Sequence, residues 1–285
     1  MTGILALLFI GAALGLIIGV VVKFFGFDPD PRQEAVEGLL PNANCGACGF
    51  AGCSAFAEAL VKGEAEPGQC PVNSQENSEE ICKLLGLTGG LQHPEVALVR
   101  CGGDNNKAKQ AGKYNGVNDC WDAQLVAGGA KGCLYGCLGL GTCSRACPFD
   151  AIEITPQGLA VVHPDLCTGC KTCVPACPRN LITMVPAAAP LHVLCNSPEK
   201  GSVTGKVCKV SCIGCRKCVK AAAESETGEM LIDGFLARTN YDNPPSADIA
   251  DVCPTGCIQK ASRQPAGVTT SDASASEPER EVLHG

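Results

Sequence analysis

The spacing of cysteines between residues 133 and 177 constrains the fold of this chain more than any other feature of its sequence. The run reads Cys133-x3-Cys137-x5-Cys143-x3-Cys147-Pro148, followed by Cys167-x2-Cys170-x2-Cys173-x3-Cys177-Pro178. The second half has the C-x2-C-x2-C-x3-C-P spacing with which proteins hold 4Fe-4S clusters. The first half ends in the same way but begins with longer gaps. We therefore expect this part of the chain to fold around iron–sulfur clusters.

A crossed ligand pattern follows from this spacing. Three thiolates on one tight loop hold three iron corners, and the Cys before Pro ligates the other cluster in two-cluster ferredoxins. The sequence therefore predicts one cluster on Cys133, Cys137, Cys143 and Cys177, and a neighbouring cluster on Cys167, Cys170, Cys173 and Cys147. The crossing brings the two clusters close together, which suits electron transfer between them.

Zinc and disulfide bonds are the alternative uses of these thiols. Structural zinc is usually held by two separated CxxC pairs, whereas these cysteines come in threes with a fourth before proline. Disulfide bonds require an oxidising compartment. The 22 cysteines and the low aromatic content of 4% indicate that clusters replace part of the hydrophobic core, so the apoprotein should fold poorly. The net charge of -7 argues against a general nucleic-acid binder.

Residues 1–26 are predicted to form a transmembrane anchor. Residues 4–22 are almost wholly apolar and are enough to span a bilayer. A cleaved signal peptide is the alternative, but no Lys or Arg precedes the run and Lys23 follows it. Because Lys23 and Arg32 both follow the helix, the positive-inside rule predicts a single-pass protein of the inner (cell) membrane with its cluster domains in the cytoplasm. The small-residue spacing of Gly11, Gly15 and Gly19 predicts a packing face for partner helices.

The rest of the chain is predicted to be of the α+β class, made of small units that form around clusters. The predicted parts are a linker (27–40), an N-terminal 4Fe-4S domain (41–86), a connecting segment (87–132), a two-cluster ferredoxin-like module (133–190), a third module (191–262) and a disordered tail (263–285). Helices are expected over 32–40, 54–62 and 78–85. Short hairpins are expected over 151–163 and around 233–234, with a strand over 181–185.

Two further cysteine groups each predict one cluster. The first is Cys45-x2-Cys48-x4-Cys53-x16-Cys70-Pro71, and the second comprises Cys212, Cys215, Cys218 and Cys253. The chain would then carry four 4Fe-4S clusters on sixteen of its 22 cysteines. The remaining six are Cys82, Cys101, Cys120, Cys195, Cys208 and Cys257. Cys82 is expected to be a buried small side chain in a helix, and Cys257 is a possible replacement for a neighbouring ligand.

An internal repeat involves several of these remaining cysteines. Cys120-x12-Cys133-x3-Cys137-x5-Cys143 matches Cys195-x12-Cys208-x3-Cys212-x5-Cys218. The unassigned cysteines that flank the two motifs leave open another cluster, a zinc site or free thiols. Their spacing matches no compact ligand loop, which favours unligated or structural roles.

A basic segment stands out against the acidic total charge. Only Glu199 opposes six cations between residues 199 and 220, which are Lys200, Lys206, Lys209, Arg216, Lys217 and Lys220. Soluble ferredoxins are acidic, so Lys206, Lys209, Arg216 and Lys217 are predicted to bind a ferredoxin. A solvated basic loop without a partner is the alternative.

The order of these features resembles that of the B subunit of the Rnf complex, called Rsx in some bacteria. The resemblance covers roughly residues 1–260 and is most specific at Asn44-Cys45-Gly46-Ala47-Cys48-Gly49 and Gly52-Cys53. The segment 137–143 resembles the longer versions of this protein found in anaerobes. Leu140 stands where the short versions have the middle cysteine of the motif, and Cys133 is the predicted substitute ligand.

The resemblance implies a membrane complex that passes electrons from reduced ferredoxin to NAD and couples this reaction to export of Na+ or H+. This chain would be its ferredoxin-facing electron carrier, while NAD and flavin would bind other membrane subunits, since the chain has no Gly-rich dinucleotide motif. Three alternatives are a donor of electrons to a redox-sensing regulator, a stand-alone anchored ferredoxin, and a non-redox zinc scaffold.

Overall fold

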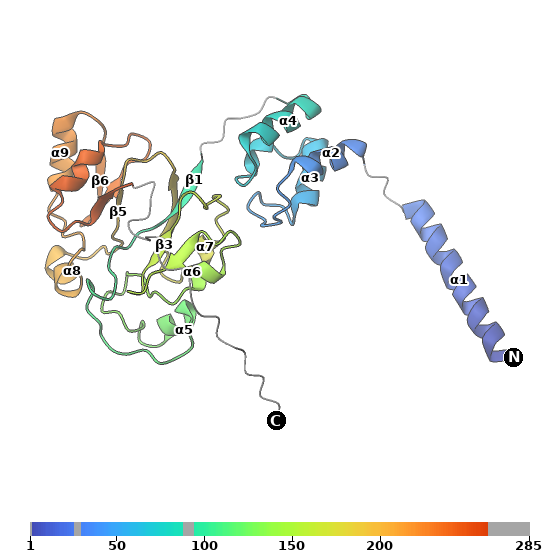
Figure 1. Cartoon of the computed structure of the whole chain (residues 1–285), viewed down its shortest axis with the longest axis horizontal. Helices are drawn as coiled ribbons and strands as arrows, with labels where there is room; N and C mark the ends of the chain where they lie inside the picture. The colour runs from blue at the N-terminus through green and yellow to red at the C-terminus, as the bar shows by residue number, and fades with distance from the viewer. Residues whose placement is uncertain (1, 26–29, 88–93, 262–285) are drawn as a thin grey trace, which may run out of the picture. The chain divides into compact units, whose positions relative to one another are not determined.

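The computed structural model describes residues 2–25, 30–87 and 94–261 of the chain. It is a mixed α+β structure that divides into two compact units, Met1–Gln92 and His93–Gly285 (Figure 1). The predicted tail, 263–285, lies outside the described residues.

The first unit is helical. Its elements are α1 (Thr2–Phe25), α2 (Pro31–Leu39), α3 (Cys53–Lys62), the 3-10 helix η1 (Pro67–Gln69) and α4 (Gln75–Leu85). Asp30 caps α2 by accepting the N–H of Arg32, and Ser74 caps α4 by accepting that of Asn77. The buried core between α2, α3 and α4 is made of Val36, Phe56, Leu60 and Ile81, with Cys70 at its edge. The predicted helices are therefore confirmed, and Cys82 is buried in α4 as expected.

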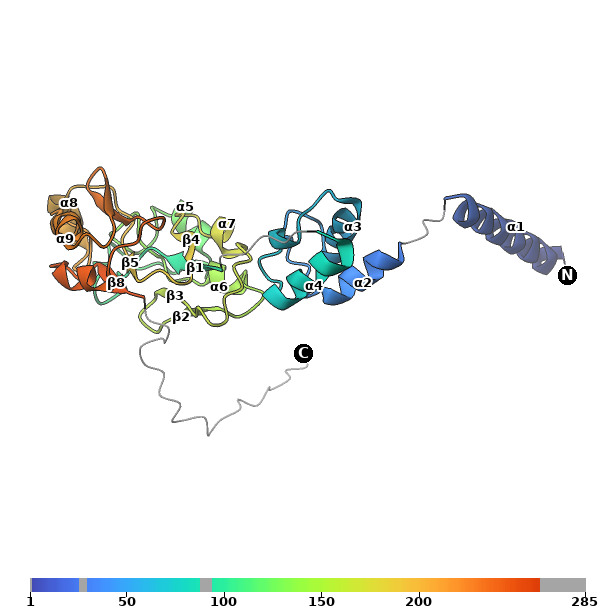
Figure 2. The ribbon, with the colours of Figure 1, turned by 90° about the horizontal axis from the view of Figure 1, so that it is seen from above.

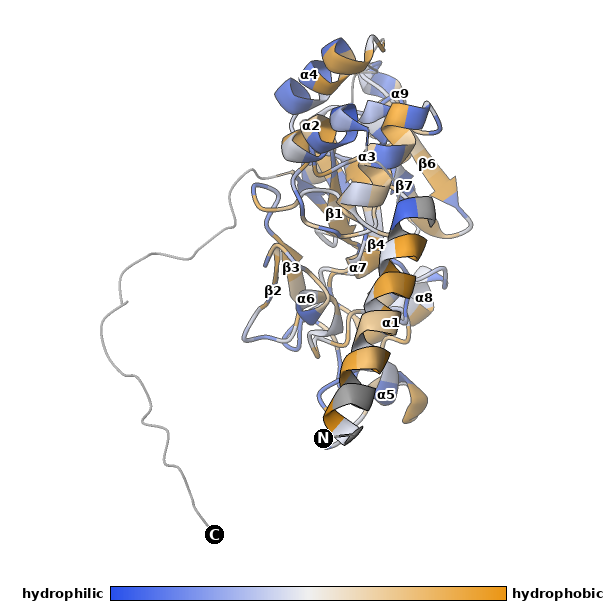
Figure 3. Cartoon of the chain, turned by 90° about the vertical axis from the view of Figure 1, so that its right-hand side faces the viewer, coloured by the Kyte–Doolittle hydropathy of each residue, from blue (hydrophilic) through white to orange (hydrophobic). Residues whose placement is uncertain are grey.

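Helix α1 covers most of the predicted transmembrane anchor. Figure 3 shows it hydrophobic over most of its length, and those of its side chains that the structure describes are exposed, with Phe9 at 82%. Over the helix residues that the structure describes, however, none of the helices meets the length and hydropathy needed to cross a membrane. The transmembrane prediction for residues 1–26 is therefore not confirmed.

The second unit begins with a half that extends to β4. Strand β1 (Glu95–Val99) pairs antiparallel with β4 (Ile182–Pro186), and β2 (Ile152–Ile154) forms the predicted hairpin with β3 (Ala160–Val162) (Figure 2). The short helices α5 (Cys120–Leu125), α6 (Thr142–Arg145) and α7 (Cys173–Ala176) complete this half. Because β1 pairs with β4, the stretch predicted as a connecting segment, 87–132, contributes a strand to this half rather than only a link to it.

The other half of this unit has a corresponding plan. Strand β5 (Leu191–Val193) pairs antiparallel with β8 (Ile258–Lys260), and β6 (Met230–Asp233) forms a hairpin with β7 (Leu236–Thr239). Helices α8 (Gly201–Val207) and α9 (Lys217–Ser225) and the 3-10 helix η2 (Ala247–Val252) lie around these strands (Figure 1). Each half thus contains one long-range strand pair and one hairpin, in agreement with the predicted repeat. Cysteines belong to both hydrophobic cores, as expected of units that form around clusters.

Candidate metal centres

The four N-terminal cysteines lie around the start of α3. The loop that carries Cys45 and Cys48 leads to Cys53, the first residue of α3, whose N–H donates to Asn44 Oδ1 at 2.8 Å. Cys70 is buried and follows η1. Burial raises the pKa of the Cys70 thiol, and the nearby Cys48 and Cys45 raise it further. Cys45 and Cys48 therefore lie near Cys70, and Cys48 and Cys53 pack against the core to which Cys70 belongs.

A second set surrounds a cavity of about 310 Å³ in the other unit. Its cysteines are Cys147, Cys167, Cys170 and Cys173, the set predicted from the crossed pattern. The N–H of Ala97 in β1 donates to Cys167 Sγ at 3.3 Å, and Thr172 Oγ1 donates to Cys170 Sγ at 3.4 Å. Such donors stabilise negative charge on sulfur, which suits a cluster ligand.

A third cavity, of about 360 Å³, is lined in part by a cysteine for which the spacing predicts no ligand role. It is lined by Cys120, Cys137, Cys143 and Cys177. The predicted substitute, Cys133, lies at another cavity instead. Cys120 therefore occupies the position beside Cys137 and Cys143 that the spacing had suggested for Cys133.

A polar network holds Cys120 next to the loop of Cys143. Asp119 caps α5 and accepts the N–H of Trp121 at 2.8 Å. Thr142 accepts the N–H of Cys120 at 2.8 Å and donates to Asp119 Oδ2 at 2.9 Å, while Arg145 pairs with the same carboxylate at 3.2 Å. The hydrogen bond from Thr142 is the main reason that the pKa of Asp119 is lowered. The sequence signal for this arrangement was Asp119, a residue type that caps helices, directly before Cys120.

The last predicted set lines a cavity of about 340 Å³. Cys212, Cys215, Cys218 and Cys253 all contact it, and so does Cys257. Cys253 Sγ lies 3.7 Å from Cys257 Sγ. Hydrogen bonding with Cys257 lowers the pKa of Cys253 and that of Cys212, and it raises the pKa of Cys257 itself. Five thiols therefore converge where a cubane needs four.

This fifth thiol leads to a prediction. Replacing Cys253 by alanine should leave the iron content nearly unchanged, because Cys257 is close enough to take over as ligand. The double change of Cys253 and Cys257 to alanine should remove about four iron atoms per chain. Iron and acid-labile sulfide assays on anaerobically purified protein measure both. Loss of iron in the single variant would contradict the replacement.

The donor set of these cavities fits iron–sulfur clusters. Burial, reinforced by neighbouring cysteines, raises the pKa of the Cys143 and Cys173 thiols to about 12. Four thiolates in one buried cavity repel each other, so a cationic metal core is needed to keep them deprotonated. In the part of the chain that the structure describes, no group of three or more Cys, His, Asp or Glu side chains is placed to hold a single metal ion.

Comparison with known proteins agrees with this chemistry. A family model described as "Putative Fe-S cluster" matches residues 40–72, and one described as "4Fe-4S dicluster domain" matches residues 135–184. These matches and the cysteine-lined cavities define the chain as an iron–sulfur protein with several cluster domains.

Relatives that align over most of the chain narrow the class further. The B subunit of an ion-translocating oxidoreductase complex from Methanosarcina acetivorans is 42% identical over 88% of this chain and 93% of its own length. The B subunit of a proton-translocating ferredoxin:NAD(+) oxidoreductase complex from Clostridium ljungdahlii is 39% identical over 88% of each chain. Its counterpart in a Na(+)-translocating complex from Acetobacterium woodii is 38% identical over 87% of this chain and 74% of its own. The chain belongs to the family formed by the B subunits of the Rnf-type ion-translocating oxidoreductase complexes.

Proposed function

We propose that this chain is the iron–sulfur subunit that carries electrons from reduced ferredoxin toward NAD in an Rnf-type complex, where the reaction drives translocation of Na+ or H+. The observation that carries the proposal is the set of cysteine-lined cavities within one compact unit, which suits a relay of electrons. The names of the relatives from Clostridium ljungdahlii and Acetobacterium woodii support the overall reaction. They differ in the translocated ion, so either ion is compatible with this family.

The proposed ligands form four sets. They are Cys45, Cys48, Cys53 and Cys70; Cys120, Cys137, Cys143 and Cys177; Cys147, Cys167, Cys170 and Cys173; and Cys212, Cys215, Cys218 and Cys253, with Cys257 beside the last set. A 4Fe-4S cluster bound at each set supplies one-electron transfer. The residues around it hold the thiolates, exclude water and adjust the reduction potential through N–H donors such as Ala97.

The proposed ferredoxin contact is the basic segment near the last set. We name Lys206, Lys209, Arg216 and Lys217 the basic patch, and all four side chains are exposed. Cys215, adjacent to Arg216, is the one cysteine of the described residues that is classed as exposed. A ligand at the surface shortens the distance to an external donor, and the surrounding cations attract an acidic protein. The basic patch and the exposed ligand together support electron uptake at this face.

Charge reversal tests this contact. Changing Lys206, Lys209 and Lys217 to glutamate should lower the rate of electron transfer from reduced ferredoxin by about tenfold or more at low salt, since rim charges act mainly on association rate. The difference should shrink at high salt, because screening weakens the attraction. Stopped-flow oxidation of reduced ferredoxin measures both effects.

A matched control distinguishes an effect of the basic patch from an effect of net charge. Lys62, Lys83 and Lys113 are also exposed but lie outside the basic patch. Reversing these three changes the total charge by the same amount and should leave the rate nearly unchanged. Equal rates for the two triple variants would refute docking at the basic patch.

We also propose that the complex is membrane-bound, with the cluster domains on the cytoplasmic side, and that α1 attaches this chain to it. Support comes from the exposed apolar side chains of α1, among them Ile4 at 68% and Leu8 at 65%. A Cβ added at Gly11, Gly15 or Gly19 would meet nothing within 4 Å. This small-residue face is therefore free to pack against helices of other subunits.

A further inference from the structure

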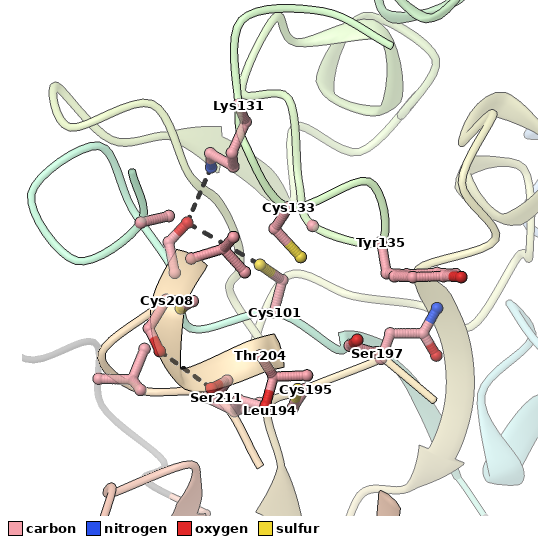
Figure 4. Close-up of a pocket in the computed structure, with 16 residues that line it drawn as sticks. Cys101, Lys131, Cys133, Tyr135, Leu194, Cys195, Ser197, Thr204, Cys208 and Ser211 are labelled. Carbon is pink, nitrogen blue, oxygen red and sulfur yellow. Dashed lines mark hydrogen bonds between the residues drawn. The ribbon is translucent and has the colours of Figure 1, made fainter. Parts of the chain in front are cut away.

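Four more cysteines line a cavity that the proposed ligand sets do not use. The cavity measures about 380 Å³ and is lined by Cys101, Cys133, Cys195 and Cys208. Three of them come from the group that the sequence left unassigned, and the fourth is Cys133. Figure 4 shows the sulfur atoms of Cys101 and Cys133 turned toward one another. The volume of this cavity is similar to the 310 to 360 Å³ of the cavities described above.

The two halves of the unit contribute equally to this cavity. Cys101 lies two residues after β1, and Cys195 lies two residues after the corresponding strand β5. Cys133 precedes Cys137 by four residues, and Cys208 precedes Cys212 by the same spacing. Each half therefore supplies one thiol after its first strand and one before its cluster motif. Cys133 and Cys208 are equivalent in the sequence repeat, whereas Cys101 and Cys195 correspond by their place after the first strand of each half.

Backbone hydrogen bonds join the halves around the cavity. The N–H of Gly102 donates to the Leu194 carbonyl at 3.0 Å. Lys109 donates to the Val207 carbonyl at 2.8 Å, and Lys209 donates to that of Lys107 at 2.9 Å. These bonds fix the segments that carry Cys101, Cys195 and Cys208.

The absence of a side chain at Gly103 leaves room between two of the sulfurs. A Cβ at this position would lie 2.9 Å from Cys208 Sγ and 3.9 Å from Cys101 Sγ. The first distance is shorter than a Cβ tolerates, so a larger residue would push Cys208 away. Glycine here keeps both thiols turned to the same space.

A buried cation provides an independent reason to expect a negatively charged group in the cavity. Lys131 lines it and is only 3% exposed. Its Nζ donates to the Gly103 carbonyl at 2.8 Å (Figure 4). Within the described ranges, no carboxylate lies within ion-pair distance of this ammonium group. A buried charge without a counter-charge is costly, and four thiolates around a metal core would supply one.

The sulfurs also receive backbone donors from two neighbouring ligand loops. The N–H of Cys137 donates to Cys101 Sγ at 3.3 Å, and the N–H of Cys212 donates to the Cys195 sulfur. Cys137 and Cys212 belong to two of the proposed ligand sets. The cavity therefore lies between these two centres and touches the loops of both.

We propose that Cys101, Cys133, Cys195 and Cys208 bind a fifth 4Fe-4S cluster, held at the junction of the two halves of the unit. Because it lies between the Cys137 and Cys212 sets, it would pass electrons from the cluster beside the basic patch to the clusters of the Cys137 and Cys147 sets. The proposal rests on the iron–sulfur function proposed above. Twenty of the 22 cysteines are then ligands, which leaves Cys82 and Cys257.

Metal analysis of the anaerobically purified full chain tests the number of clusters. We expect about 20 iron and 20 acid-labile sulfide per chain, as five cubanes require. About 16 iron without zinc would overturn the fifth cluster and leave the proposed function intact. About 16 iron with one zinc would replace it by a structural zinc site. An iron-free protein would refute the proposed function as well.

Two variants locate the site. Changing Cys195 and Cys208 to alanine should remove about four iron atoms and keep the remaining clusters. Changing Gly103 to valine should do the same, because a ligated Cys208 cannot move aside. Gly112→Val is the matched control, since a Cβ at Gly112 meets nothing within 4 Å. Full iron content in both Gly103→Val and the double cysteine variant would overturn the site. If the variants do not fold, the iron content of the unaltered protein, about 20 or about 16 per chain, tests the fifth cluster instead.

Discussion

The Cys120→Ala variant is expected to lose about four iron atoms per chain and most of its electron transfer from reduced ferredoxin. The reason is the cavity that Cys120 shares with Cys137, Cys143 and Cys177. Without Cys120, three thiolates remain, and α5 contains no second cysteine that could replace it. Iron content and the electron paramagnetic resonance of the reduced protein measure the loss.

A second substitution tests whether the lost ligand can be restored at another position. Leu140 stands where a compact C-x2-C-x2-C motif has its middle cysteine. The double variant Cys120→Ala with Leu140→Cys should therefore regain most of the iron. Cys82→Ala is the control, because Cys82 is buried in α4 of the other unit. The ligand assignment fails if Cys120→Ala keeps its full iron content or if the Cys82 variant loses as much.

Removal of iron is expected to unfold the His93–Gly285 unit while the α2–α4 helices retain much of their structure. The cavities of this unit are enclosed by the same cysteines that belong to its two cores. Metal bound at such sites contributes folding free energy directly, because the unfolded chain does not hold the ligand cysteines together.

The helical unit has a different source of stability. Val36, Phe56, Leu60 and Ile81 form an ordinary apolar core there, and Cys70 is the only cysteine among its fully buried members. Hydrogen exchange measured by mass spectrometry, before and after removal of iron with an oxidant and a chelator, distinguishes the two units. Protection should be lost across β1–β8 and largely kept in α3 and α4. Equal loss in both units would contradict the difference.

Local spacing explains which parts could be predicted from the sequence. Cys167, Cys170 and Cys173 lie on one tight loop, and that loop geometry dictates three ligands whatever the surrounding fold. The hairpins around Gly158 and Gly234 and the capped helices α2 and α4 are equally local. Each of these follows from a few consecutive residues.

Long-range pairing explains what could not be predicted. Cys120 reaches its cavity because Asp119 and Thr142 connect segments that lie 23 residues apart. Strand β1 was missed because its partner, β4, follows more than eighty residues later. The junction cavity needs thiols from four segments, and the repeat hinted at their relation without showing which of them meet. Spacing identifies ligand loops, whereas contacts between loops depend on the assembled fold.

The crossed arrangement of the central cysteines also has a consequence for biogenesis. Cys120 and Cys177 line one cavity, whereas Cys147 lines the next one together with the loop of Cys167. During synthesis, each of the two ligand sets therefore stays incomplete until its last cysteine, Cys173 or Cys177, has left the ribosome. The two central sites then become complete almost simultaneously rather than one after the other. Until then the free thiols of the nascent chain are open to oxidation and to other metals. The rate of translation between Cys120 and Cys177 therefore sets how long they are exposed.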